Sequence, residues 1–105
     1  MAKRKLAFDE TEVVMAVVIK LDFGKEKAKI INATYDQFSR ISILKTEERK
    51  LFKLVPSEKI VIKLKSYGQE FEYSKMKNKE FYEEYKTNFI KFAERNRIDL
   101  VDETK

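Results

Sequence analysis

The sequence predicts a small α+β domain with several helices and one two-stranded hairpin. Three observations support this class. The chain has 105 residues, which is the length of one domain, and 43% of them are hydrophobic, which is enough to form a core. Apolar residues follow the 3–4 spacing of a helix in several segments and strict alternation in another. We therefore treat residues 1–105 as a single domain.

The first element is ambiguous between a helix and a strand. Residues 9–22 begin with Asp9-x-x-Glu12, a capping-box spacing in which each side chain can satisfy a backbone N–H at a helix start. The run 13–19 that follows is apolar on every side and mostly β-branched, which suits a buried strand equally well. We expect a helix, with the strand as the alternative. Residues 28–32 then predict a short strand.

Two helices are expected in the middle of the chain. Thr34-x-x-Gln37 is a second capping box, followed by apolar residues spaced for one helical face. Thr46 is a new start signal with two glutamates behind it, where the helix dipole favours anions. This pattern predicts a turn and then a second helix over residues 46–55. Because the apolar spacing continues across the turn, one uninterrupted helix over residues 34–55 is the alternative.

A β-hairpin is predicted next, because residues 60–65 and 70–74 alternate between apolar and charged side chains. The expected pairs are Leu64 with Phe71, Ile62 with Tyr73, Lys65 with Glu70 and Lys63 with Glu72. This register gathers the apolar pairs on one face and the opposite charges on the other. Gly68 is expected to supply the positive φ of the turn.

The last helix is predicted over residues 78–96, with Asn78 as its cap and Asn96 as its stop. Its aromatic side chains have 3-4-3 spacing: Tyr82, Tyr85, Phe89 and Phe92. This stripe is either a core face of the domain or the interface of a homodimer, since paired helices use the same spacing. The polar residues 99–105 are expected to fray.

In order, the expected elements are helix, short strand, helix, turn, helix, hairpin and helix. This order over residues 9–75 resembles the winged helix-turn-helix family, with an extra C-terminal helix. The resemblance implies that residues 46–55 are the recognition helix and that Lys63–Phe71 are the two-stranded hairpin wing. Residues 42–46 depart from the family, because they are longer than its tight turn and contain no glycine.

Size, composition and element order are similar to those of small winged-helix accessory proteins of the relaxosome of clostridial conjugative plasmids. That resemblance implies a non-catalytic protein that binds double-stranded DNA at a plasmid transfer origin, as a homodimer and beside other relaxosome proteins.

The charge distribution favours a polyanionic partner. The chain has 23 Lys and Arg against 18 Asp and Glu; residues 1–77 carry a net charge of +6 and residues 78–105 carry −1. A solvated surface with no partner has similar charges. The candidate DNA contacts are Lys3, Arg4 and Lys5 in a basic N-terminal arm (residues 1–8), Thr46, Arg49, Lys50 and Lys53 on the expected helix, and Lys63, Lys65, Ser66, Tyr67 and Gln69 on the hairpin.

Several functions are disfavoured by composition. The chain has no Cys and no His, which removes thiolate nucleophiles and ordinary zinc sites, and its acid and base residues form no catalytic cluster. We expect no enzyme activity, cofactor or metal. The apolar run 13–19 is too short to cross a membrane, and no signal peptide is visible, so we expect a cytoplasmic protein without a membrane partner. The alternative function is a protein-binding module of phage or mobile-element origin, inhibitor- or antitoxin-like, that uses the aromatic C-terminal helix.

Overall fold

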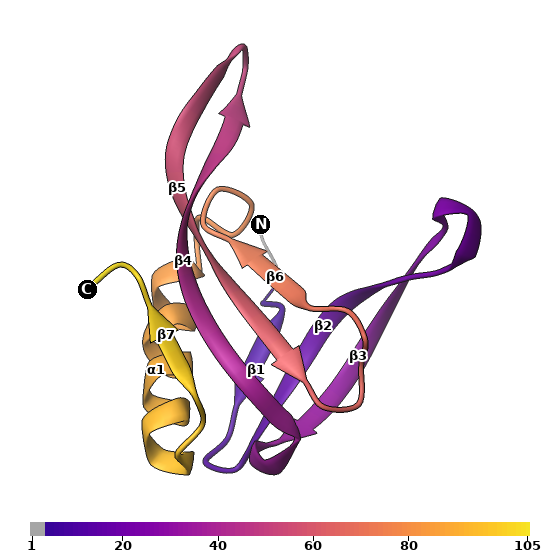
Figure 1. The fold of residues 1–105 in the computed structure, drawn as a ribbon, viewed down its shortest axis with the longest axis vertical. Coiled ribbons are helices and arrows are strands. Elements are labelled where there is room, and N and C mark those ends of the chain that lie inside the picture. The colour runs from indigo at the N-terminus through magenta and orange to yellow at the C-terminus, as the bar shows by residue number, and fades with distance from the viewer. Residues whose placement is uncertain (1–3) are drawn as a thin grey trace.

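A computed structural model describes residues 4–105 as seven strands in two sheets with one α-helix (Figure 1). The strands are β1 (Leu6–Phe8), β2 (Glu12–Lys20), β3 (Glu26–Thr34), β4 (Phe38–Lys50), β5 (Lys53–Leu64), β6 (Phe71–Ser74) and β7 (Leu100–Asp102), and the helix is α1 (Tyr82–Asn96). The chain is 52% strand and 21% helical, so the predicted winged helix-turn-helix is wrong.

The first sheet has the strand order β1-β2-β3 and corrects the helix expected over residues 9–22. β2 pairs antiparallel with β3 along its whole length, from Glu12 opposite Thr34 to Lys20 opposite Glu26. Val13, Met15 and Val17 alternate into the core, as the period of a strand requires. The β-branched composition of this run therefore decides against the helix.

The second sheet has the order β6-β5-β4-β7 and replaces both helices expected between residues 34 and 55. β4 pairs antiparallel with β5 from Phe38 to Lys50, with one irregularity near Phe38. The capping-box contact at Thr34 does form, because the Thr34 N–H donates to Gln37 Oε1 at 2.8 Å. It stabilises a single 3₁₀ turn, Tyr35–Gln37, and not a longer helix.

The predicted hairpin forms between β5 and β6, but its register differs by two residues. Ile62 lies opposite Phe71 and Ile60 opposite Tyr73. Because side chains alternate with a period of two, the apolar face remains as predicted while the expected charge pairs do not form. The connection is the loop 65–70, and Gly68 does not adopt a positive φ.

The C-terminal helix ends at Asn96 as predicted, and Arg97 follows in the left-handed conformation at φ 55°. It begins at Tyr82, after a turn that starts at Asn78. The tail does not fray: β7 pairs parallel to β4, with Leu100 opposite Ile41.

One core lies between the sheets and α1. Phe89 packs edge-on against Phe8 at 4.7 Å between ring centroids, and Phe92 packs against Phe38 at 5.2 Å. The predicted aromatic stripe of α1 is 0–4% exposed: Tyr82, Tyr85, Phe89 and Phe92. These side chains belong to the core of a single chain. They offer no exposed surface for the predicted dimer interface or for a protein partner.

Two long hairpins extend beyond this core (Figure 1). The β2–β3 arm comprises residues 17–29, with Val17 still buried at its base, and the β4–β5 arm comprises residues 46–57. In Figure 1 they diverge, with the β4–β5 arm at the top and the β2–β3 arm at the right. The helix α1 lies at the opposite end of the molecule, so the arms are set apart from the packed body.

Candidate functional site

The ends of the two arms carry large apolar side chains in water. Phe23 is 99% exposed and Phe52 is 100% exposed, and Leu51 beside it is 85% exposed. Leu21 and Leu54 are also exposed, and none of these five side chains packs against the core. Single exposed apolar residues are common, but two clusters at the ends of two projecting hairpins are not.

The backbone at each end is in a conformation that bulky residues rarely adopt. Phe23 has a φ of 61° and Leu51 a φ of 57°, both in the left-handed region. Leu51 and Phe52 connect β4 to β5 directly, a position where Gly, Asn or Asp is the usual choice. A left-handed residue with a side chain costs about 1–2 kcal/mol. Folding alone therefore does not favour these residues at these positions.

The excess positive charge of the protein lies at the same two hairpin ends. We define the tip segments as residues 20–29 and 49–54. Together they contain 7 basic and 2 acidic side chains, which leaves 16 basic and 16 acidic side chains in the rest of the sequence. Within residues 4–105, no carboxylate lies within 4.0 Å of Arg49, Lys50 or Lys53. The tip segments are therefore both cationic and apolar.

Glu48 fixes the base of the β4–β5 arm. Its Oε2 accepts hydrogen bonds from the Ser57 hydroxyl at 2.5 Å and from the Met76 N–H at 3.4 Å. Burial acts to raise the pKa of Glu48, but hydrogen bonds from Ser57, Ser74 and Met76 outweigh it and lower the pKa below its ordinary value. The carboxylate is thus held in its ionised form, and it ties the arm to the loop before α1.

Four of the predicted DNA contacts lie together on the β4–β5 arm. Arg49, Lys50 and Lys53 belong to its tip segment, and Thr46 lies opposite Ser57 at its base. The expected recognition helix is wrong, but the same residues remain neighbours because a hairpin turn replaces the helix. Lys50 and Lys53 are the residues directly next to Leu51 and Phe52, which form the turn.

The predicted wing residues lie elsewhere, at the far end of β5 from this arm. Lys63 is opposite Arg40, and Lys65 and Ser66 are exposed in the following loop. Tyr67 packs against Phe71 at 5.4 Å between ring centroids. These residues do not join the tip segments.

Residues 4–8 of the predicted N-terminal arm are held against the body. Lys3 lies outside the described residues. Arg4 forms an ion pair with Glu84 and lies 4.6 Å from the centre of the Phe81 ring. The Lys5 N–H donates to Tyr85 Oη at 2.8 Å, and the Lys5 carbonyl accepts from the Ala16 N–H. Arg4 and Lys5 are therefore parts of the fold.

The β2–β3 tip segment was missed by sequence reasoning, although two signals mark it. Phe23 stands in a charged turn next to Gly24, where an apolar side chain has no core to enter. Lysines at 25, 27 and 29 alternate behind it, which places them on one face of a strand.

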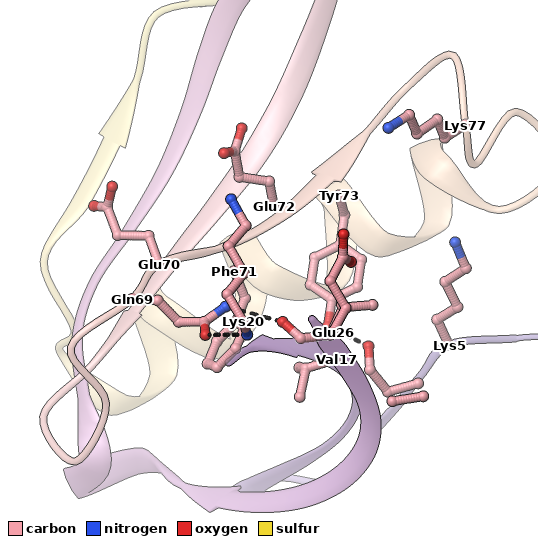
Figure 2. A pocket seen from close by; sticks show the side chains of 13 residues that line it. Lys5, Val17, Lys20, Glu26, Gln69, Glu70, Phe71, Glu72, Tyr73 and Lys77 are labelled. Atoms are coloured by element: carbon pink, nitrogen blue, oxygen red, sulfur yellow. Dashed lines mark hydrogen bonds between the residues drawn. The ribbon is translucent and has the colours of Figure 1, made fainter. Parts of the chain in front are cut away.

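A second surface feature is a groove between β2 and β6, with a volume of about 430 Å³ (Figure 2). Gln69 crosses it: its Oε1 accepts from the Lys20 N–H and its Nε2 donates to the Val18 carbonyl, both at 2.9 Å. The charged side chains that line the groove are Lys5, Lys20, Lys77, Glu26, Glu70 and Glu72. Equal numbers of both signs give it no preference for an anion or a cation.

No family model, curated protein or solved structure matches this chain. In residues 4–105, no helix has both the length and the apolar character needed to cross a membrane.

Proposed function

We propose that this protein binds double-stranded DNA without catalysing a reaction, and that it does so through the two arms. The observation that carries the proposal is the concentration of net positive charge in the two tip segments. Its place of action is then the compartment that holds the DNA, for which we propose the cytoplasm.

The shape of the arms supports this ligand. A two-stranded antiparallel ribbon is narrow enough to enter the major groove of B-DNA, which is about 12 Å wide, and strands are also used in the minor groove. Each arm is such a ribbon, and its lysines and arginines can reach the phosphates that border a groove. Two diverging arms allow the duplex to be held at two places.

The spacing of the cations also favours DNA. Lys29 lies opposite Val17, three residue pairs behind the last pair of the arm, Lys20 with Glu26, which corresponds to about 10 Å along the strands. A duplex presents one negative charge for about every 1.7 Å of its axis, so cations distributed along a ribbon can all find phosphates. A lipid surface would contact mainly the cations nearest the turn, because interfacial segments enter only about 5–10 Å.

Salt dependence tests the proposal directly. We expect the affinity for a duplex of about 25 base pairs, measured by fluorescence anisotropy, to fall linearly in a log–log plot between about 50 and 200 mM salt. The triple variant Arg49→Ala, Lys50→Ala and Lys53→Ala should bind about tenfold more weakly or worse at low salt. Its salt slope should be smaller by about 2.7, since each phosphate contact contributes about 0.9.

The control removes the same charge from the body. Lys79→Ala, Lys91→Ala and Lys105→Ala replace three exposed lysines outside the arms. We expect this variant to keep most of the affinity and slope of the wild type. Equal losses in both triple variants would show that net charge alone attracts DNA, and an absence of binding at low salt would overturn the proposal.

A further inference from the structure

Binding phosphates requires cations but not exposed aromatic rings, so the apolar part of the tips needs its own explanation. Phe23 and Phe52 are each fully exposed, and each belongs to a tip with a left-handed bulky residue. Both the exposure and the conformation are unfavourable for the isolated chain. The cost of exposure is removed when another molecule covers the rings.

The flanking residues define the chemistry of that molecule. Lys50 and Lys53 are paired across the turn, directly behind Leu51 and Phe52. Two like charges opposite each other are unfavourable unless an anion lies between or beside them. A partner that is anionic at its rim and apolar immediately inside would complement both features. A DNA duplex has this arrangement, with phosphates outside and the faces of stacked bases within.

We propose, on the basis of the DNA binding proposed above, that Phe23 and Phe52 are wedges that insert between adjacent base pairs and bend the duplex. Apolar side chains that enter from the minor groove unstack a base step and kink DNA by about 20–90°. The cations of each arm hold the phosphates on either side of the wedge. The bend then brings more of the duplex into contact with the arms.

Unstacking is easiest at pyrimidine–purine steps and hardest in A-tracts. The protein therefore selects deformable duplexes without reading base edges. We expect a duplex with two TA steps to bind about tenfold more tightly than an A-tract duplex of equal length and charge, because TA steps unstack more easily.

End-to-end energy transfer in a doubly labelled duplex, measured at saturating protein, reports bending separately from affinity. The wild type should raise the transfer efficiency. The double variant Phe23→Ala, Phe52→Ala should still saturate the duplex in anisotropy, with a loss of affinity of about tenfold, but leave it straight. Both rings are exposed, so the variant should keep the circular dichroism of the wild type.

A matched control truncates two exposed apolar residues outside the tip segments, Ile30→Ala and Val101→Ala. This variant should bend DNA like the wild type. Wild-type binding without bending, or bending by the double variant, would overturn the wedges and leave the DNA-binding proposal intact. If the wild type ignores the duplex but binds vesicles that contain phosphatidylserine, and the double variant does not, both proposals are overturned and the tips are membrane anchors.

Discussion

The side chain of Gln69 forms hydrogen bonds with the open edge of β2, as a neighbouring strand would. β1 covers only part of this edge, and the side-chain amide of Gln69 pairs with the backbone of Val18 and Lys20 farther along. A side-chain amide carries both an acceptor oxygen and N–H donors, so it can satisfy a carbonyl and an N–H at a sheet edge. The sequence suggested a DNA contact for this residue, but both of its polar atoms are used within the fold.

We expect Gln69→Ala to lower the free energy of unfolding by about 1 kcal/mol, because two hydrogen bonds are lost and water replaces them only in part. Urea denaturation measures this change. Glu70→Ala, at the exposed neighbouring position, should change stability by less than about 0.5 kcal/mol. Equal effects at the two positions would contradict a structural role for the amide.

Leu51 offers a second test at the scale of a single residue. Its φ of 57° suits Asn far better than Leu. We expect Leu51→Asn to raise the free energy of unfolding by about 0.5–1 kcal/mol, measured as a higher urea midpoint. Leu54→Asn, at an exposed strand position without a left-handed backbone, should bring no such gain. A lower midpoint for Leu51→Asn would show that Leu51 makes a stabilising contact.

The base of the β4–β5 arm is linked to the loop before α1 through Glu48. Glu48 accepts hydrogen bonds at the arm base from Ser57 and from Met76, which precedes α1. Since these bonds lower its pKa in the folded protein, ionised Glu48 stabilises the fold. That contribution is complete above the ordinary glutamate pKa and is lost as the pH falls through the lowered pKa of the folded state.

Glu48→Gln should therefore be less stable than the wild type at neutral pH, by about 1 kcal/mol, because hydrogen bonds to a charged acceptor become bonds to a neutral one. The difference should shrink as the pH is lowered, when the wild-type carboxylate is protonated as well. Urea denaturation of both proteins at a series of pH values checks this. The exposed Glu47→Gln is the control, and a difference that persists in acid would contradict the assignment.

The whole molecule consists of a packed body and two arms that contribute little to the core. The same substitution should therefore have opposite consequences in the two parts. We expect Phe89→Ala, at a fully buried ring, to cost about 3–5 kcal/mol, whereas Phe52→Ala should leave stability unchanged or slightly higher. Thermal unfolding measures both. A clear loss of stability for Phe52→Ala would mean that the ring packs within the folded chain in solution.

The aromatic helix and the apolar face of the β5–β6 hairpin could be predicted because their patterns are complete within one segment. The 3-4-3 spacing from Tyr82 to Phe92 places these side chains on one face of a helix. Alternation around Ile62 and Phe71 defines a strand face. The register was wrong by two residues because the loop 65–70 is longer than the tight turn expected at Gly68. A shift of two residues preserves the face and changes the partners.

The class of fold could not be predicted, because the choice between helix and strand was decided by distant partners. Residues 34–55 contain helix-like caps and spacing. Ile41 is nevertheless paired in a sheet with Ile62, which is far along the chain. The same holds for Met15 and Ile31. The energy of pairing between such distant strands cannot be inferred from any one short window of sequence.

Amino-acid order alone therefore specifies a cationic chain, the aromatic face of its last helix and one face of a hairpin. These are local properties, set by periodicity and charge within short stretches. The site does not follow from such local properties, because strand pairing places Phe23 and Phe52 at hairpin ends, where both are exposed. Such exposure is a property of the assembled sheets, since whether an apolar side chain is buried depends on which other segments reach it.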